Sequence, residues 1–290
     1  MLLPILYLGL WNNSDRQVYF IRGSDTEVNL ALALAERFME RDDEISLAVS
    51  GGGSGTGITA LISGKTDVAN SSREFKLSEK KMAKDRGVNP VPFIFAVDGL
   101  ALIVNDSNSV KRLRLDQISA LYRGEIKNWK NVGGPDAEVT LYGRQSNSGT
   151  YVFFQDEVVQ ANFSPEVRQM NGTAQIVEAV RSDPSAIGYV GVGYVRKADG
   201  SLLAGLRVVP IQIGKNPESI SPLEPGVISD GTYPLSRPLF QYTDGVPQGL
   251  LREFLLFETS ELGQQIVEQD GYFKIAPHHR DQNAKNLQID

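Results

Sequence analysis

One layout occurs three times in this chain and constrains its fold more than any other feature. In each copy, a β-rich apolar run is followed by a turn of glycine, serine and threonine and then by a helix-like segment. The turns lie at residues 23–26, 50–57 and 143–149. Strands that alternate with helices are typical of α/β proteins. The sequence therefore predicts an α/β fold in which three polar turns each precede a helix.

The apolar spacing gives approximate bounds for these elements. Strands are expected near residues 18–21, 45–49 and 139–142, and helices near 28–38, 56–63 and 150–159. Two further segments, 91–105 and 233–243, read as extended strands, and the first is long enough to cross between two domains. One amphipathic helix is expected over 247–269.

Composition excludes several classes of protein. A chain of 290 residues can form two domains, and its net charge of −6 argues against a general nucleic-acid binder. The absence of cysteine excludes disulfides, thiolate metal sites, cysteine nucleophiles and a lipid anchor carried by cysteine. No apolar run reaches the roughly 18 residues of a membrane-spanning helix. Residues 1–11 are apolar but short, so they could be part of a signal peptide, a first strand or a disordered end.

The glycine-rich turn at 50–57 nearly matches two nucleotide-binding motifs. Gly52 and Gly57 have the spacing of a phosphate-binding P-loop, but Ile58 replaces the lysine that must reach the phosphates. A dinucleotide-type G-x-G-x-x-A match begins at Gly55, but Phe75 stands where an acidic residue is expected. A nucleotide site is therefore disfavoured. The turn could also be a surface loop in which glycine only supplies positive φ angles.

The three turns share a chemistry that suits an anion. Ser-Gly-Thr occurs at residues 54–56 and again at 148–150, each time at the start of an expected helix. A helix N-terminus presents unpaired N–H groups and a partial positive charge, so three of them could surround a tetrahedral oxyanion. Arg144 and Arg73 could add charge-assisted hydrogen bonds. Ordinary helix caps and surface arginines are the alternative for the same residues.

These motifs resemble the periplasmic phosphate-binding proteins of the ABC phosphate uptake system. The similar segments include "GSDT", "SGGGSGTGI", "DVANSSR" and "RQSNSGTYVFF", and the similarity covers roughly residues 17–275. The resemblance implies a two-lobed type II periplasmic-binding-protein fold whose lobes close on the ligand by a hinge motion. We expect residues 1–104 and 211–290 to form the first lobe and 105–210 the second.

The resemblance also implies a function and a ligand set. The expected protein is a monomer outside the cytoplasm that binds inorganic phosphate and delivers it to a membrane ABC permease. No catalysis, cofactor, metal or nucleic acid is expected. The expected ligand residues are Ser24, Asp25, Thr26, Ser54, Gly55, Thr56, Ser72, Arg144, Ser146, Ser148, Gly149 and Thr150.

This chain departs from the family at two acidic positions. Family members often carry aspartate where this sequence has Ser72 and Ser146. Such a carboxylate accepts the proton of hydrogen phosphate and repels sulfate. Asp25 could supply the missing acceptor, or it could cap the helix that follows it.

Other functions compatible with these residues remain open at this point. The site could hold another tetrahedral oxyanion such as sulfate or arsenate, or the chain could be an enzyme acting on a phosphorylated substrate. Against an enzyme, no nucleophile–base pair is visible, and the two histidines, His278 and His279, read as a solvated tail. A sensory or adhesive role would use the same lobes.

Overall fold

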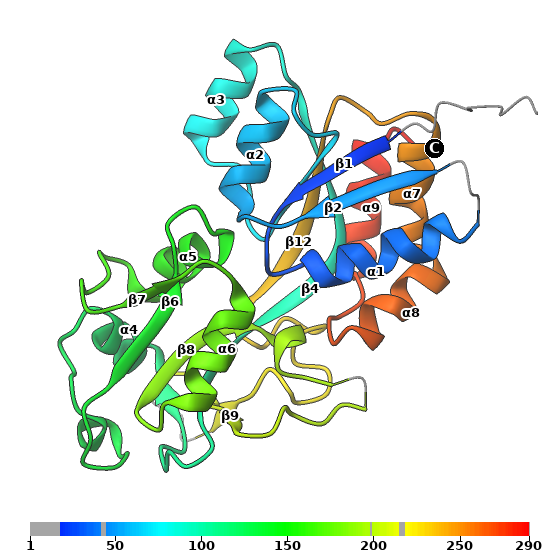
Figure 1. Ribbon diagram of the computed structural model, residues 1–290. Coiled ribbons are helices and arrows are strands. Elements are labelled where there is room, and N and C mark those ends of the chain that lie inside the picture. Colours follow the sequence, from blue (N-terminus) through cyan, green and yellow to red (C-terminus); the bar gives the residue numbers. More distant parts are fainter. Residues whose placement is uncertain (1–17, 42–44, 198, 215–217, 290) are drawn as a thin grey trace, which may run out of the picture.

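The computed structural model describes residues 18–41, 45–197, 199–214 and 218–289. The segment 1–11, discussed above as a possible signal peptide, lies outside the described residues. The chain forms two lobes that are joined by long strands, as seen in the ribbon view (Figure 1). This two-lobed α/β architecture confirms the fold predicted from the resemblance.

A single long strand, β4 (Pro90–Asn105), runs through both lobes. Its first part pairs antiparallel with β12 (Ser236–Asp244), from Pro90 to Gly99. Its second part pairs with β8 (Ala186–Gly191), from Leu100 to Val104. Nearly all of β4 is buried, because it is covered on both faces in each lobe. The segment 91–105 therefore crosses between the lobes, as its length predicts.

The first lobe contains a sheet in the order β2-β1-β3-β12-β4. Strand β1 pairs in parallel with both β2 and β3. The carboxyl ends of these three strands therefore lie at the same edge of the sheet. Its strands and helices are β1 (Val18–Gly23), β2 (Ser46–Ser50), β3 (Val68–Ser71), α1 (Val28–Met39), α2 (Ser54–Ile62), α3 (Leu77–Asp85), α7 (Gly249–Glu258), α8 (Glu261–Gln269) and α9 (Pro277–Asn286).

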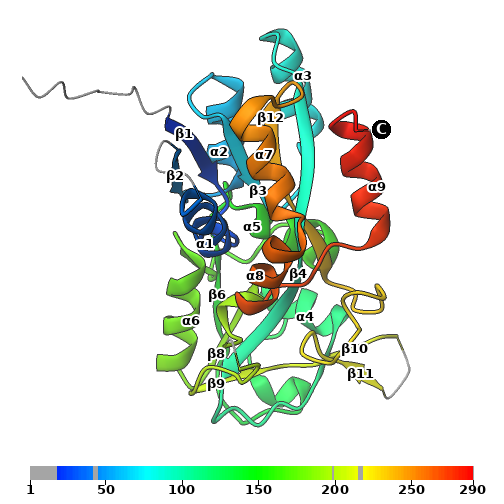
Figure 2. The same cartoon turned by 90° about the vertical axis from the view of Figure 1, so that its right-hand side faces the viewer.

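The second lobe continues the sheet in the order β4-β8-β6-β7, and β9 pairs with the end of β4. A three-stranded sheet of β11, β10 and β5 lies beside it (Figure 2). The elements are β5 (Leu113–Arg114), β6 (Thr140–Arg144), β7 (Arg168–Met170), β9 (Leu206–Val208), β10 (Ile211–Gln212), β11 (Ser219–Ile220), α4 (Leu115–Tyr122), α5 (Gly149–Phe154), α6 (Thr173–Ser182) and short helical turns at Trp129–Val132, Gln155–Val159 and Val192–Tyr194.

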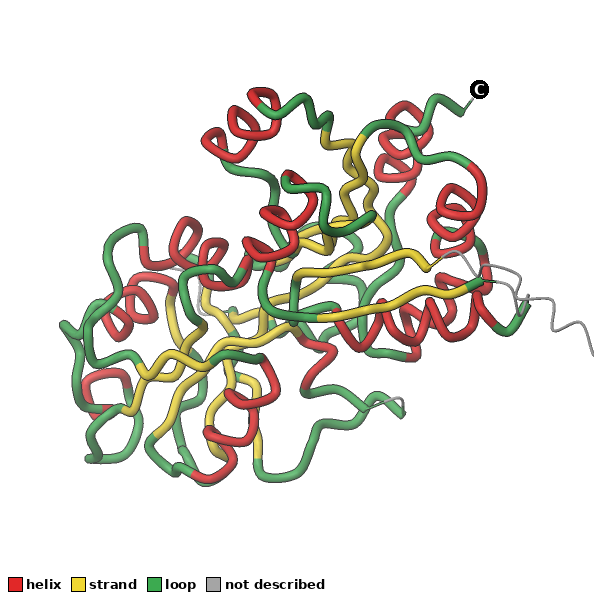
Figure 3. Tube along the Cα trace, turned by 45° about the horizontal axis from the view of Figure 1, so that its top comes forward, coloured by secondary structure: helices red, strands yellow, loops and turns green. Residues whose placement is uncertain are grey.

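The three predicted strand–turn–helix units are confirmed, since α1, α2 and α5 each follow a polar turn. Figure 3 shows strands and helices joined by loops throughout the molecule. Two expectations about helices are wrong. The helix expected over 150–159 changes to a π-helical turn at Gln155, and the helix expected over 247–269 is interrupted at Thr259 and Ser260. The Ser260 hydroxyl accepts a hydrogen bond from the Gly263 N–H at 3.2 Å, so this serine starts a new helix.

The C-terminal residues also differ from the expected solvated tail. They form α9, which packs against β4 through the side chain of Asn283. The Asn283 amide bonds both the N–H and the carbonyl of Ile94, at 2.8 and 2.7 Å. Nδ1 of His279 accepts a hydrogen bond from the Ala276 N–H at 3.3 Å at the start of the same helix. His279 is therefore part of a helix cap.

Each lobe has its own aromatic core. In the first lobe, Phe38 of α1 meets Phe254 of α7 edge-on at 5.3 Å between ring centroids. In the second, Phe154 of α5 stacks on Tyr189 of β8 at 4.0 Å. These contacts hold α1 against α7 and α5 against β8, which helps to fix the polar turns that precede α1 and α5. In the described part of the chain, no helix has both the length and the apolar character needed to cross a membrane.

A carboxylic acid, Glu258, lies fully buried at the end of α7. One of its oxygens accepts a hydrogen bond from Gln241 Nε2 at 3.1 Å, and the other has no partner among the described residues. Burial raises the pKa of Glu258 well above its ordinary value. The folded protein therefore retains a proton that the unfolded chain releases as pH rises.

We predict that Glu258→Gln reduces the loss of stability at higher pH. The pKa of Glu258 is raised in the folded protein. Glu258 therefore contributes most to the free energy of unfolding at pH values below about 4.5, the ordinary pKa of glutamate, and this contribution declines as pH rises. Urea unfolding at pH 5 and pH 8 should therefore show a smaller decline for the variant than for the native chain. The control is Glu253→Gln, on the exposed side of the same helix. An equal decline in both variants would contradict the prediction.

Candidate anion-binding site

The polar turns of the two lobes meet at the lobe interface, where α2 and α5 face each other (Figure 1). Across this interface, the hydroxyls of Thr26 and Thr150 are 2.7 Å apart. Asn147 accepts a hydrogen bond from the Gly55 N–H through its carbonyl at 2.9 Å, and its amide donates to the Gly52 carbonyl at 2.9 Å. The structure therefore has its lobes in direct contact.

Arg144 lies at the centre of this interface. It ends β6, and its side chain is only 1% exposed. Nη1 donates to the Thr173 hydroxyl at 2.8 Å, and Nη2 donates to the Asn171 carbonyl at 2.9 Å and to Asp25 Oδ2 at 2.5 Å. Nε is buried and has no acceptor among the described residues. The guanidinium is thus held rigidly by three hydrogen bonds, and its buried Nε–H is still available.

Asp25 is the first-lobe partner of this arginine. Its Oδ2 accepts from Arg144, and its Oδ1 accepts from the Gly52 N–H at 2.8 Å. The Tyr194 hydroxyl donates to the Asp25 carbonyl. Helix α1 begins at Val28, and no side chain caps it. The alternative in which Asp25 caps this helix is therefore wrong, and Asp25 instead joins the two lobes.

Buried hydroxyls surround the ion pair. Ser24, Thr26, Ser54, Ser72, Ser148 and Thr150 are each at most 2% exposed. Ser54 Oγ accepts a hydrogen bond from the Ser72 N–H at 3.1 Å. A Cβ atom at Gly149 would lie 2.3 Å from Ser54 Oγ and 2.6 Å from Ser72 Oγ. Only glycine at position 149 therefore permits this approach of the second lobe.

The two Ser-Gly-Thr turns differ in what their amides do. In α5, Ser148 caps the helix by accepting from the Tyr151 N–H at 3.4 Å. The first amides of a helix, here those of Gly149 and Thr150, have no acceptor within the helix. In α2, by contrast, the Gly55 N–H bonds Asn147 and the Thr56 N–H bonds the Gly53 carbonyl at 3.0 Å. Helix α5 is therefore better suited to hold an anion with its backbone.

Three of the twelve expected ligand residues lie apart from the buried group. Gly55, Thr56 and Ser146 line an open groove on the surface of the molecule, and Thr56 and Ser146 are exposed. The other nine lie at the buried interface. The structure thus divides the expected set into an inner group and an outer group.

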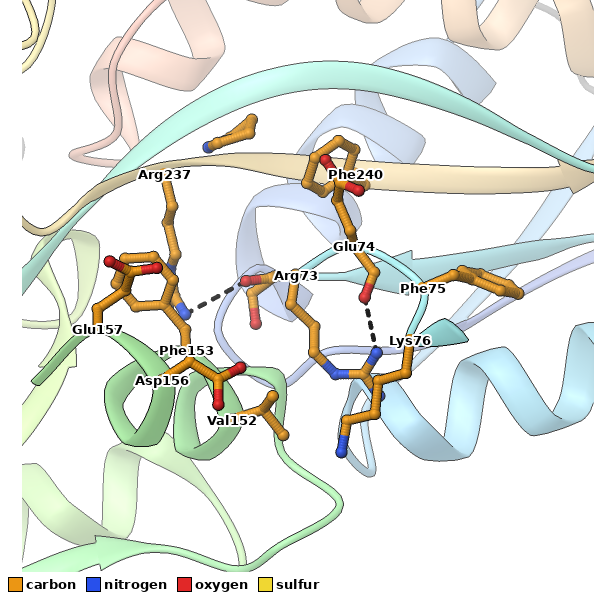
Figure 4. A pocket seen from close by; sticks show the side chains of 12 residues that line it. Arg73, Glu74, Phe75, Lys76, Val152, Phe153, Asp156, Glu157, Arg237 and Phe240 are labelled. Carbon is orange, nitrogen blue, oxygen red and sulfur yellow. Dashed lines mark hydrogen bonds between the residues drawn. The ribbon is translucent and has the colours of Figure 1, made fainter. Parts of the chain in front are cut away.

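A second buried arginine, Arg237 of β12, was missed by the sequence analysis. Its Nη2 donates to Asp98 Oδ2 at 2.9 Å and to the Thr150 hydroxyl at 3.0 Å. Its Nη1 donates to the Ser72 carbonyl at 3.3 Å, and its guanidinium lies 5.0 Å from the ring centroid of Phe153 (Figure 4). The sequence did contain a signal for this pair, because one charged residue interrupts each of two apolar extended segments. These residues are Asp98 in 91–105 and Arg237 in 233–243.

Asp98 and Glu27 lie beside the inner group. Asp98 is fully buried on β4, and its Oδ1 accepts from the Val192 N–H at 3.2 Å. Glu27, also fully buried, lies near this pair, and burial raises the pKa of its carboxyl well above the ordinary value. The two arginines and two aspartates of the interface cancel in formal charge.

Arg73 forms an ion pair with a residue of the same lobe. It is buried and forms two hydrogen bonds with the Glu79 carboxylate, at 2.7 and 2.8 Å. It also donates to the Glu74 carbonyl at 2.7 Å (Figure 4). These bonds fix the loop after β3 and neutralise the charge of Arg73, so it is not a solvated surface side chain.

Comparisons with known proteins agree with this geometry. Residues 12–261 match the family described as "PBP superfamily domain". The chain is 30% identical to the phosphate-binding protein PstS of Pseudomonas aeruginosa, over 91% of this chain and 85% of that protein. It is 31% identical to PstS of Bacillus subtilis, over 91% of this chain and 84% of that protein. This chain belongs to the PstS family of the PBP superfamily.

Solved structures of family members have the same fold. A phosphate ABC transporter substrate-binding protein from Clostridium perfringens, described with bound phosphate, matches with a TM-score of 0.78 and 28% identity. The match covers 90% of this chain and 100% of that one. An ABC-type phosphate transport receptor from Vibrio cholerae matches with a TM-score of 0.70 and 26% identity, over 89% and 100%. The type II fold predicted from the sequence is confirmed.

The buried ion pair Asp98–Arg237 generates a prediction about stability. Asp98→Asn leaves the Arg237 charge buried without a partner, which should reduce the free energy of unfolding by about 3 kcal/mol. The double variant Asp98→Asn with Arg237→Gln should be more stable than Asp98→Asn alone, because it removes the unpaired charge. Urea unfolding measures both.

The matched control is an exposed ion pair of the second lobe, Lys127–Glu166, whose side chains are 57% and 56% exposed. Glu166→Gln should lower the free energy of unfolding much less than Asp98→Asn does. A double variant no more stable than Asp98→Asn would show that the charge of Arg237 is compensated in another way.

Proposed function

We propose that this chain binds inorganic phosphate between its two lobes and delivers it to a membrane ABC transporter, without catalysis. The observation that carries the proposal is the state of Arg144. Its side chain is 1% exposed and held by three acceptors, yet its Nε–H has no partner among the described residues. Buried donors are rarely left without an acceptor, so this N–H supports an anionic ligand at the same place. The names of the relatives support phosphate as that anion.

The proposed ligand residues are those of the inner group. Arg144 would supply a charged donor, and the N-terminus of α5 would supply the amides of Gly149 and Thr150. The hydroxyls of Ser24, Thr26, Ser54, Ser72 and Ser148 would supply further donors. We add Arg237, because it already donates to the Thr150 hydroxyl at 3.0 Å. Since the charges of the aspartates and arginines cancel, the anion would be held mainly by oriented dipoles.

The proposal includes a division of the chain into two lobes. The packing supports assigning residues 105–235, rather than 105–210, to the second lobe. Ile211 pairs with Leu113 in the small sheet, and Ile228, Tyr233 and Leu235 lie in the same core as Tyr122. The first lobe would then comprise residues up to 104 and from 236. The two lobes would separate for ligand entry by bending of β4 and β12.

The location and oligomeric state that we propose for this chain are based on its PstS-type relatives. A PstS-type protein works with an ABC transporter, and we propose that this chain acts as a monomer outside the cytoplasm. The particular permease is identified by the genes beside the coding sequence. Uptake of labelled phosphate by cells that lack and then regain this gene tests the transport step.

We predict that Arg144→Ala weakens phosphate binding at least about thirtyfold. Loss of a charge-assisted contact to a buried anion costs about 2 kcal/mol or more. Calorimetric titration of the native chain and the variant with phosphate, arsenate and sulfate measures the effect and the ligand preference together. The control is Arg123→Ala, an exposed arginine of the same lobe that pairs with Glu125. An unchanged dissociation constant for Arg144→Ala would place this residue outside the site.

We propose that Asp25 also distinguishes hydrogen phosphate from sulfate. Its carboxylate oxygens each accept one hydrogen bond, from Arg144 and from the Gly52 N–H. A carboxylate has about four acceptor positions, so it can accept one more from the proton of a bound phosphate. Sulfate carries no such proton and would be repelled by the same charge.

Asp25→Asn should therefore weaken phosphate binding and narrow the gap between phosphate and sulfate. Ser24→Ala is a useful control, because it removes a neighbouring hydroxyl without changing charge. Competition of sulfate against phosphate in the same titration gives the ratio of the two affinities. A variant with the full native preference would show that another acceptor selects the ligand.

A further inference from the structure

A groove of about 600 Å³ lies outside the closed interface. It is lined by the exposed face of α2, by the end of β1 and by the loop that carries Ser146 and Asn147. It therefore touches both lobes. Through Gly55, Thr56 and Ser146 it is continuous with the turns that lead to the buried group.

The groove carries an excess of positive charge in an acidic protein. Its basic residues are Arg22, Lys65, Arg73 and Lys76, and Glu79 is the one carboxylate that lines it. Glu79 forms an ion pair with Arg73, so these two charges cancel. The remaining three positive charges belong to Arg22, Lys65 and Lys76. Among the described residues, none of these three forms an ion pair, whereas the whole chain has a net charge of −6.

The three cations are placed where solvent can reach them. Lys65 and Lys76 are exposed, and Figure 4 shows Lys76 extending past the guanidinium of Arg73. Arg22 is half-buried and lies 5.2 Å from the ring centroid of Phe20, which holds it in place. An anion that enters the groove therefore meets cations from three segments, namely β1, the turn after α2 and the loop before α3.

Three of the four hydroxyls that line the groove donate to nearby backbone carbonyls. Thr56 donates to the Gly52 carbonyl at 2.8 Å, and Thr59 donates to the Gly55 carbonyl at 2.8 Å. Ser63 donates to the Thr59 carbonyl at 2.7 Å. The fourth hydroxyl belongs to the exposed Ser146. The groove therefore attracts an anion mainly by charge and has few oriented neutral donors with which to select one anion over another.

We propose that this groove is an outer capture site that draws small oxyanions toward the lobe interface by charge alone. The inference rests on the proposed function. It assigns to the groove the rate of phosphate association and not the rate at which the bound anion leaves. Clefts lined with one sign of charge raise association rates by about 10 to 1000-fold, and salt removes the effect. Because the groove is not selective, phosphate and sulfate are drawn in alike.

The test is the triple variant Arg22→Gln, Lys65→Gln, Lys76→Gln. Rapid mixing with radiolabelled phosphate followed by filtration gives the association rate, and a chase with unlabelled phosphate gives the dissociation rate. At 20 mM KCl we expect the association rate to fall about tenfold, with the dissociation rate changed less than about twofold. At 0.5 M KCl the native and variant association rates should agree within about twofold, because the charges are then screened.

The matched control removes the same number of charges elsewhere. Lys84, Lys111 and Lys285 are exposed and do not line the groove, so changing all three to glutamine alters the net charge equally. This control should lower the association rate much less. Thermal unfolding of both triple variants shows whether either change affects the fold.

Three results would overturn the proposal. These are equal association rates in the two triple variants, a loss that appears in the dissociation rate, or a changed ratio of phosphate to sulfate affinity. The last would mean that the groove residues contact the bound ligand. Failure of the proposed function looks different, because the native chain itself would then bind no labelled phosphate.

Discussion

The ion pair between Arg144 and Asp25 is the interaction on which the arrangement of the interface depends. It joins a strand end of the second lobe to a turn of the first, at 2.5 Å, in a place where the arginine is almost without solvent. A buried guanidinium without a counter-charge would be very costly. The turn at residues 23–26 must therefore come to Arg144, and the hydroxyls of Thr26 and Thr150 meet as a consequence. Contact between the lobes and neutralisation of this charge are therefore found together in this structure.

A second ion pair connects the site to the strands between the lobes. Asp98 lies on β4 and Arg237 on β12, next to the positions where β4 changes partner from β12 to β8. The pairing of β4 and β12 also has an irregularity between Leu239 and Phe240. Any bending of these strands moves Arg237 relative to Thr150, to which it donates. The angle between the lobes and the position of this donor are therefore mechanically coupled.

Sequence reasoning predicted what depends on neighbours in the chain. The strand, turn and helix of each unit follow from local apolar spacing and from Ser, Gly and Thr at helix starts, so α1, α2 and α5 were found. What was missed depends on contacts between distant segments. From the sequence alone, Asp25 could equally be a helix cap, because its partner Arg144 is 119 residues away in the chain. Arg237 and Asp98 are 139 residues apart, and only the pairing of β4 with β12 brings them together. Likewise, the outward position of Gly55, Thr56 and Ser146 follows from how the lobes meet.

The close approach at Gly149 sets a limit on the size of the ligand. In the closed structure there is no room even for a methyl group at this position, because Ser54 Oγ and Ser72 Oγ would lie 2.3 and 2.6 Å from it. A phosphate monoester carries a carbon chain on one oxygen, and that chain would have to leave through this contact or hold the lobes apart. The free anion carries no such chain. The interface would thus act as a steric filter that rejects esterified phosphate by bulk, independently of any charge or proton that the ligand carries.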